Sequence, residues 1–296
     1  MSVAEKLTLV VTCTDRKSAQ PVDDLRVGNL PPARAEERAI QWRNALAKEC
    51  SRFCLRELYQ GDAWRQALKL ESSARLAGFE PTLVVASAGL GLVDADEEWP
   101  AYAATFSPRH ADSIGSSAKE NRDWWRLMTD GQTNFIEQTA GQTLLVLSET
   151  YSAAMAADLN AMEHRKDVVV FGGSPDVPAH LRIPADQGLR AALGGTTGSL
   201  NLRTAVAWIE SLRAPTLVGQ RDHIQWRNWV QETRKPESYN RTTMSDADIL
   251  SFLRDIRRVQ PGISKTRALR VLRDAGSACE QKRFGGLFSI ATKEEK

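Results

Sequence analysis

Short apolar runs alternate along this chain with longer segments in which apolar residues recur every three or four positions. Five runs rich in Val, Leu and Ile predict β-strands, at residues 7–12, 82–88, 143–148, 167–173 and 180–183. The periodic segments predict helices, at residues 34–59, 63–77, 117–129, 152–162 and just before residue 212. Strands that alternate with helices are typical of a mostly parallel, helix-covered sheet, so we expect a Rossmann-like α/β fold.

The pattern changes after residue 213. Residues 214–243 contain Pro215, Pro236 and many polar residues, which is typical of a linker, and one connecting helix is expected within it at 224–232. Beyond the linker, three short amphipathic helices are expected, at residues 245–258, 267–275 and 279–288. The sequence therefore predicts an α/β domain over 1–213, a linker over 214–243, and a small all-α, helix-turn-helix-like domain over 244–296.

Basic residues concentrate in the last segment of the chain. Residues 235–296 hold 13 Lys and Arg against 8 Asp and Glu, a net charge of +5, whereas the rest holds 26 basic and 29 acidic residues. A clustered basic excess on short helices is typical of nucleic-acid binding, so we expect DNA as a partner. The residues expected to contact it are Lys265, Arg267, Arg270, Arg273, Lys282 and Arg283. The alternative is an ordinary solvated helix face.

Composition narrows the class of protein. The 296 residues carry a net charge of only +2, and no apolar run approaches the roughly 20 residues that span a bilayer. No secretory leader is visible before the first strand, so we expect a cytoplasmic protein without membrane contacts. The four cysteines form no CxxC pair and the four histidines are scattered, which predicts reduced thiols and no metal site. No cofactor is expected.

The first strand ends in reactive residues. Cys13, Asp15 and Lys17 follow it directly, and ligands of open α/β sheets bind just beyond the carboxyl ends of strands. A neighbouring cation favours the thiolate, which is the reactive form of cysteine. Cys13 is therefore a candidate nucleophile with Lys17 as its activating cation. The alternative is that Cys13 is a small buried apolar residue.

Small or polar residues also follow the other strands, where they would line a ligand cleft. Ser87 joins the catalytic candidates, and two aromatic residues that follow it belong either to the core or to a stacking surface for a base. A Gly/Thr/Ser turn near residue 195 could bind an anion ahead of a helix, although a tight structural turn explains it equally. The substrate-binding candidates are Gly89, Tyr102, Phe106, Ser148, Glu149, Gly172, Gly194, Gly195, Asn201 and Arg203.

Three segments resemble the YaaA-like proteins. A C-x-x-K/R-K strand end recurs in that family and is matched here by residues 13–17, and its S-A-x-x-G-L turn is matched by residues 87–92. The third segment holds Tyr102 and Phe106, and the resemblance spans about residues 7–210. Within this group the chain looks most like the DpdC-like family of bacterial 7-deazaguanine DNA-modification clusters. That resemblance implies hydration of the nitrile of 7-cyano-7-deazaguanine in DNA to the amide, with other proteins of the cluster as further partners.

Two mechanisms are compatible with these residues. In the first, Cys13 attacks the nitrile, Asp15 moves protons or orients water, and Ser87 with the amides near Gly89 stabilises charge on the nitrogen. Tyr102 or Phe106 would stack on a flipped base and Glu149 would accept from its edge. In the second, Asp15 or Glu149 activates water directly. The alternatives to an enzyme are a non-catalytic YaaA-like DNA-binding stress protein and a nucleotide-sensing component of a defence system.

Overall fold

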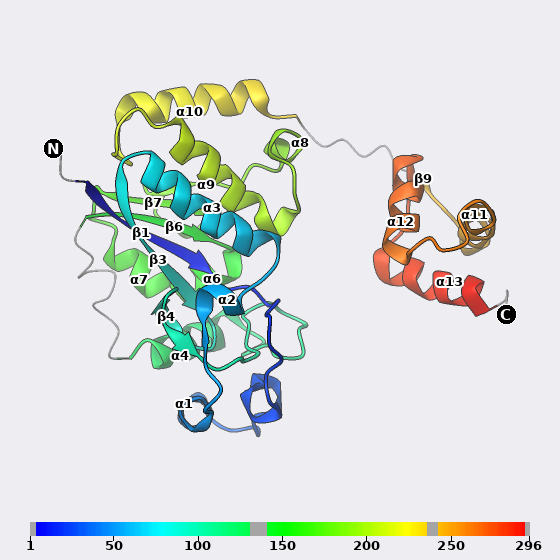
Figure 1. Ribbon diagram of the computed structural model, residues 1–296, viewed down its shortest axis with the longest axis horizontal. Helices are drawn as coiled ribbons and strands as arrows, with labels where there is room; N and C mark the ends of the chain where they lie inside the picture. The colour runs from blue at the N-terminus through cyan, green and yellow to red at the C-terminus, as the bar shows by residue number, and fades with distance from the viewer. Residues whose placement is uncertain (1–3, 131–140, 236–241, 294–296) are drawn as a thin grey trace. The chain divides into compact units, whose positions relative to one another are not determined.

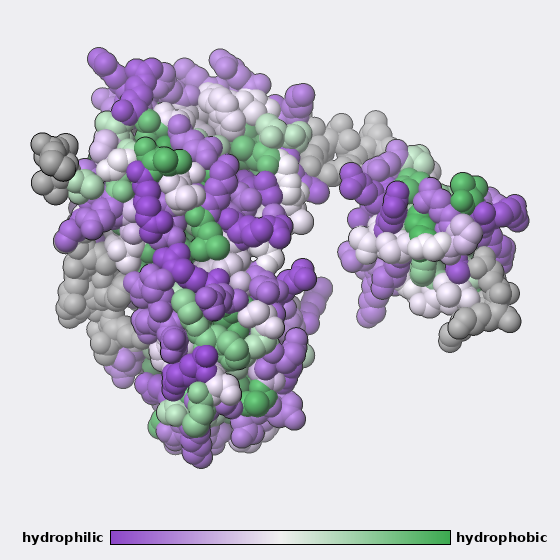
Figure 2. All heavy atoms as spheres, in the orientation of Figure 1, coloured by the Kyte–Doolittle hydropathy of each residue, from purple (hydrophilic) through white to green (hydrophobic). Residues whose placement is uncertain are grey.

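The computed structural model describes residues 4–130, 141–235 and 242–293 (Figure 1). The chain divides into two compact units, Met1–Lys235 and Pro236–Lys296. In the part of the chain that is described, no helix combines the length and the apolar character that crossing a membrane requires. Hydrophilic side chains cover most of the face of each unit that Figure 2 shows, and apolar residues form small separate patches there.

A six-stranded sheet forms the centre of the first unit, with the strand order β4-β3-β1-β6-β7-β8. Its strands are β1 (Glu5–Thr12), β3 (Phe79–Ser87), β4 (Gly91–Asp94), β6 (Gln142–Leu147), β7 (Val168–Gly172) and β8 (Arg182–Ile183). All neighbours pair in parallel except β4, which is antiparallel to β3. The expected α/β class and mostly parallel sheet are confirmed, and the parallel strands end at one shared edge.

Helices cover both faces of this sheet (Figure 1). On one face lie α3 (Asp62–Leu76), α9 (Leu200–Ser211) and α10 (Gln220–Thr233), and on the other lie α1 (Ala35–Lys48), α4 (Ala118–Met128), α6 (Glu149–Ala154) and α7 (Ala156–Ala161). Shorter elements connect them: η1 (Asp23–Leu25), η2 (Val27–Asn29), β2 (Phe53–Cys54), α2 (Leu55–Leu58), β5 (Glu98–Trp99), η3 (Gln187–Leu189), α8 (Arg190–Leu193) and η4 (Thr197–Ser199). Two layers of helices thus bury the apolar runs from both sides.

Three local predictions were wrong. The expected helix over 34–59 ends at Lys48, because residues 53–54 leave it to pair with β5. The expected helix over 152–162 begins earlier, at Glu149, and is interrupted at Met155 between α6 and α7. The segment after Ser87, expected as a turn, turns back as β4 and adds an antiparallel edge strand. In the first and third cases, strand pairing overrides the local pattern.

The segment expected as a linker belongs mostly to the first unit. The unit extends to Lys235, and α10 packs on it through Trp226, which is buried. The Trp226 ring meets Phe171 of β7 edge-on, with centroids 6.3 Å apart, and stacks on Trp229 at 4.7 Å. The helix expected at 224–232 is therefore part of the covering layer, and the boundary lies at residue 235 rather than 213.

The second unit is a small helical domain around its own core. Its elements are β9 (Thr242–Thr243), α11 (Asp246–Val259), α12 (Lys265–Asp274), β10 (Ser277–Ala278) and α13 (Gln281–Lys293). Ser245 and Ser264 cap α11 and α12 by accepting backbone N–H groups. Ile249, Leu269 and Phe284, one from each helix, are buried in its core. The order of helices is compatible with a helix-turn-helix-like unit, which stays a prediction.

Candidate functional site

Cys13 lies at the shared carboxyl edge of the sheet. It continues β1 by one residue, because its N–H donates to the Ala86 carbonyl of β3 at 3.0 Å. The residue is half-buried, and its Sγ lies 3.0 Å from the hydroxyl of Tyr151 in α6. Burial and the nearby thiol raise the pKa of Tyr151 well above its ordinary value, so the phenol keeps its proton. Either the thiol or the phenol can donate in this contact, so the Tyr151 hydroxyl can serve as a hydrogen-bond donor to the Cys13 sulfur.

Lys17 brings an ammonium group into the same place. Its backbone forms a bridge with Tyr59, and its Nζ lies 4.4 Å from the centre of the Tyr102 ring and 5.5 Å from that of Tyr59. Nζ also donates to the Thr14 carbonyl at 3.3 Å. Burial lowers the pKa of Lys17, and the negative charges of Cys13, Asp15 and Asp112 oppose that shift. A lysine of lowered pKa both stabilises a nearby thiolate and gives up its proton more readily.

A chain of buried hydroxyls, from Tyr59, Tyr102 and Ser87, packs behind this ammonium, and we call it the wall of the site. The Tyr59 and Tyr102 hydroxyls are 2.6 Å apart, and the Tyr102 and Ser87 hydroxyls are 2.5 Å apart. Burial raises the pKa of both tyrosines well above the ordinary value. Ser87 Oγ also accepts the N–H groups of Gly89 and Leu90, each at 3.1 Å. These contacts fix the turn between β3 and β4.

Two of the predicted roles at this turn do not fit the geometry. The Ser87 side chain is 0% exposed, and the Gly89 amide is already bonded to it. Ser87 and Gly89 therefore shape the wall and do not present donors to a substrate. Tyr102 and Phe106 are also buried, so stacking on a base is not their role here. A side chain at position 89 would meet the Tyr102 ring at 2.6 Å, which explains the glycine.

Other side chains complete the wall, and sequence reasoning missed them. The indole N–H groups of Trp42 and Trp124 donate to the carbonyls of Gly89 and Ala88, each at 2.7 Å. Tyr151, which packs edge-on against Phe106, supplies the partner of Cys13. Tyr151 lies three residues beyond the third predicted strand, which indicates the sheet edge but not its contact with Cys13. Nothing in the sequence indicates the roles of Trp42 and Trp124, since both stand at helix positions that are typical of ordinary core residues.

The ends of β6 and β7 have a different structure. Asn201 Nδ2 donates to the Leu147 carbonyl at 3.0 Å, and a Cβ on Gly172 would lie 2.1 Å from that same nitrogen. Gly172 also has a φ of 78°, a conformation that favours glycine. Asn201 and Gly172 are therefore used in joining the strand ends to α9, which is not the substrate contact predicted for them.

The Gly/Thr/Ser turn near residue 195 is structural as well. Arg203 binds the Asp62 carboxylate at 2.8 and 3.0 Å and donates to the Leu193 carbonyl at 3.2 Å. A Cβ on Gly195 would lie 2.2 Å from Arg203 Nε, whereas one on Gly194 would meet nothing within 4 Å. The arginine thus ties this turn to the start of α3 through Asp62. The prediction that these residues bind an anion is not supported.

Three predicted polar residues lie near the sheet edge with different surroundings. Ser148 caps α6, since its Oγ accepts the Tyr151 N–H at 3.3 Å. Glu149 follows it in the first turn and is exposed. The Asp15 side chain is 73% exposed, and its Oδ1 lies 3.7 Å from His110 Nε2. Asp15 therefore stands in solvent beside the thiol cluster, which we define as Cys13, Lys17, Tyr59, Tyr102 and Tyr151.

The predicted DNA-contacting residues of the second unit fall into two groups. Arg283 pairs with Asp246 at 2.6 Å, Arg273 donates to the Cys279 carbonyl at 3.3 Å, and Arg270 lies 3.7 Å from Asp274. The others are exposed, and no ion pair joins them to another described residue; they are Lys265, Arg267 and Lys282. The second group has charges that remain available to a phosphate.

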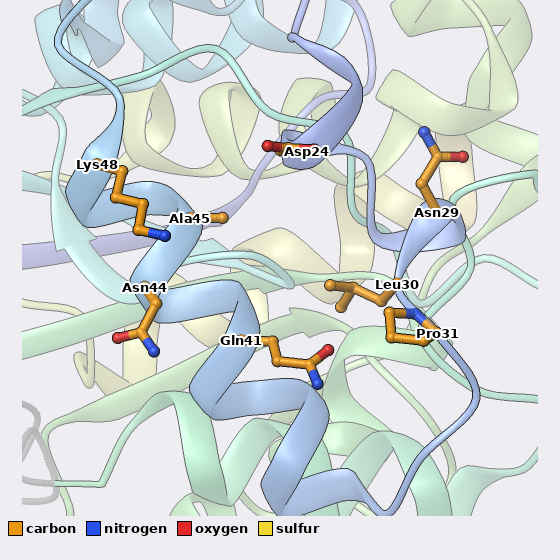
Figure 3. A pocket seen from close by; sticks show the side chains of 8 residues that line it. All are labelled: Asp24, Asn29, Leu30, Pro31, Gln41, Asn44, Ala45 and Lys48. Carbon is orange, nitrogen blue, oxygen red and sulfur yellow. The ribbon is translucent and has the colours of Figure 1, made fainter.

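A hollow of about 540 Å³ lies between α9 and α10, away from the thiol cluster. Two further hollows also lie away from it. One, of about 320 Å³, separates the η1–η2 loop from α1 (Figure 3) and is lined by Asp24, Asn29, Leu30, Pro31, Gln41, Asn44, Ala45 and Lys48. The other, of about 550 Å³, lies between β8 and α10. Cys13 and Lys17 line neither of them. The η1–η2 loop nevertheless reaches the neighbourhood of the cluster, because Arg26 lies 3.6 Å from Asp112.

The described residues contain no group of three or more His, Cys, Asp or Glu side chains that could hold a metal ion. The side chains described above provide a thiol, an ammonium and phenols in the thiol cluster, with the Asp15 carboxylate and the His110 imidazole beside it. Comparison of the chain with protein-family models, with curated proteins and with solved structures finds no match in any of the three.

Proposed function

We propose that this protein is a DpdC-like enzyme that modifies a base in DNA, hydrating the nitrile of 7-cyano-7-deazaguanine to the amide. One observation carries the proposal: the Cys13 thiol lies 3.0 Å from the Tyr151 hydroxyl, and the desolvated Lys17 ammonium lies in the same cluster. A nitrile carbon is a weak electrophile, so its hydration needs an activated nucleophile and a proton donor for the nitrogen. The thiol cluster supplies both.

The first step is addition of the thiol. The Cys13 thiolate forms a bond to the nitrile carbon, one π pair moves to the nitrogen, and Lys17 gives that nitrogen a proton. The product is a neutral thioimidate on Cys13, with Lys17 left as the amine. The lowered pKa of Lys17 makes this transfer easier than it is from an ordinary lysine. Tyr151 holds the sulfur before attack.

Water completes the reaction. Its oxygen bonds to the thioimidate carbon, Asp15 takes one proton from it, and the imine nitrogen receives that proton from Asp15. The tetrahedral carbon then carries a hydroxyl, an amino group and the Cys13 sulfur. The hydroxyl proton passes to the Lys17 amine as the carbon–sulfur bond breaks, and the electron pair returns to the sulfur. The amide is released, and the thiolate and ammonium are restored.

The second unit supports a polymer substrate. Lys265, Arg267 and Lys282 present exposed charges that form no close ion pair with another described residue. Binding phosphates through such side chains gives affinity without sequence specificity. Recognition of the modified base would then come from the first unit.

The same basic residues favour a second candidate function, a non-catalytic DNA-binding protein of the YaaA-like group. DNA binding of this kind requires only the second unit, and Cys13 would then have a packing role without chemistry. To separate the two, the protein is incubated with DNA that contains the cyano base, and the DNA is digested to nucleosides for mass spectrometry. The enzyme adds the mass of one water to the modified nucleoside. DNA binding without that gain supports the non-catalytic function.

A further inference from the structure

The loop between Phe106 and Ile114 contains the one backbone outlier among the residues that the structure describes. Arg109 has a φ of 64°, and every other described residue with a positive φ is a glycine. A left-handed conformation at a residue with a side chain is disfavoured and persists only where the surroundings impose it. Such strain gathers at functional sites. The residue that this turn positions is His110.

The orientation of the His110 ring is fixed by its neighbours. The Asp112 backbone N–H donates to His110 Nδ1 at 3.1 Å, so Nδ1 is an acceptor and the neutral ring carries its proton on Nε2. Nε2 faces Asp15 Oδ1 at 3.7 Å. Asp112 is itself held, because it is buried and accepts the Gly28 N–H at 3.4 Å. The ring therefore presents an N–H donor to the Asp15 carboxylate.

Asp15 has little else to hold it. Its side chain is largely exposed, and among the described residues His110 is the one that lies within ion-pairing distance of it, while the Lys17 ammonium attracts it from further away. A free carboxylate next to the thiol cluster would rotate among several positions, and a displacement of about 1 Å can cost about 100-fold in rate. The position of Asp15 thus depends on the ring of His110.

We propose that His110 is a positioning residue, which aims Asp15 at the water that attacks the Cys13 thioimidate. This inference rests on the proposed function and concerns its second half. His110 forms no bond with the substrate and keeps its Nε2 proton throughout. Asp15 takes the proton from water and returns it to the imine nitrogen, while the Nε2–H of His110 keeps the carboxylate oriented.

Two substitutions separate the two ring nitrogens. His110→Asn keeps an oxygen where Nδ1 accepts the Asp112 N–H but provides no donor that reaches Asp15. His110→Gln carries its amide donor further out, at the place of Nε2. Arg109→Gly is the matched control for the loop, since glycine adopts the same φ without strain. In single turnovers with cyano-base DNA, intact-protein mass spectrometry follows the covalent adduct on Cys13 and its decay.

In His110→Asn and Asp15→Asn we expect the adduct to form at the normal rate and to accumulate, because its hydrolysis slows by about 100-fold when the Asp15 carboxylate is misplaced or absent. His110→Gln and Arg109→Gly should hydrolyse it at close to the wild-type rate. Wild-type decay of the adduct in His110→Asn would overturn the inference. So would equal slowing in His110→Asn and His110→Gln, which would mark the ring as a loop support only.

A second measurement does not depend on activity. Long-range nitrogen-15 NMR of the full chain reports which ring nitrogen of His110 carries the proton. We expect the Nε2–H form, with an Nε2 resonance that moves in Asp15→Asn. An Nδ1–H ring, or a resonance unmoved by that substitution, overturns the inference whether or not the protein hydrates nitriles. A wild-type protein without turnover but with this His110 signature defeats the proposed function and leaves the placement of Asp15 standing.

Discussion

Two stretches of the same sheet edge have similar sequences and different structures. The ends of β1 and β3 carry small polar residues and glycine, and so do the ends of β6 and β7. At β1 and β3 the space next to the chain is filled by tyrosine hydroxyls, a thiol and an ammonium. At β6 and β7 it is filled by Asn201, which binds a backbone carbonyl.

The two ends differ in the side chain that packs against the glycine. Gly89 admits the Tyr102 ring, whose hydroxyl then joins the buried chain next to Lys17. Gly172 admits the amide of Asn201, which is consumed in joining α9 to the sheet. A glycine at a strand end thus indicates that another group packs closely against the backbone. It does not indicate whether that group belongs to a reactive site or only joins two elements of the fold. The following predictions test this contrast, beginning with the largest effect.

Cys13→Ser should abolish hydration of the cyano base while DNA binding persists, because a hydroxyl of ordinary acidity cannot replace the thiolate. The nucleoside mass assay measures the first effect and a filter-binding titration the second. Cys50→Ser is the control, since Cys50 is an exposed cysteine outside the cluster. Full activity in Cys13→Ser would leave water activated by a carboxylate as the mechanism.

At the ends of β6 and β7, Gly172→Ala should lower the free energy of unfolding by about 3 kcal/mol. The new methyl group would collide with Asn201, and the φ at this position is unfavourable for alanine. Gly194→Ala also has a positive φ but open space, so only the backbone penalty of about 2 kcal/mol is expected. Urea unfolding measures both. Equal losses in the two variants would contradict the role assigned to Asn201, and a selective loss of turnover in folded Gly172→Ala would place this end in the active site.

Lys17→Met should lower turnover by about 100-fold, since the proton donor is lost, without lowering stability at neutral pH. Folding lowers the pKa of Lys17 from its ordinary value of 10.5, so the unfolded chain binds the extra proton between the lowered value and 10.5. The free energy of unfolding of the wild-type protein therefore rises as the pH rises through that window, because the unfolded chain loses its extra proton on Lys17. Lys17→Met lacks this increase. Urea unfolding at several pH values measures it. A Lys17→Met protein with the same pH dependence would contradict the desolvation of Lys17.

The smallest effect is expected in the second unit. Arg267→Ala should reduce the slope of log affinity against log salt by about 0.9, the release of one counterion, without changing the fold. Arg283→Ala is the contrasting variant, because it removes the ion pair with Asp246. Its helical circular dichroism should melt at a lower temperature. An unchanged salt slope in Arg267→Ala would remove α12 from the DNA-binding surface.

Periodicity predicted the sheet because its strands are continuous apolar runs, and it placed Cys13 and Lys17 at the correct edge. It could not predict Tyr151 as the partner of Cys13, since the two are separated by 138 positions and meet only through the pairing of β1 with β6. Asn201 and Arg203 were wrongly predicted to bind substrate, because their side chains are of types that often bind ligands. Only the fold shows that Asn201 already binds the Leu147 carbonyl and that Arg203 already pairs with Asp62.

Rapid quenching of a single turnover measures whether the Cys13 sulfur becomes bonded to the substrate carbon. Cyano-base DNA is mixed with excess protein and quenched in acid at successive times, and peptides are mapped by mass spectrometry. We expect a transient adduct on the Cys13 peptide that forms before the amide and decays as the amide appears, with none on Cys50. Amide formation at the full rate with no adduct on Cys13 at any time would contradict a covalent role for Cys13.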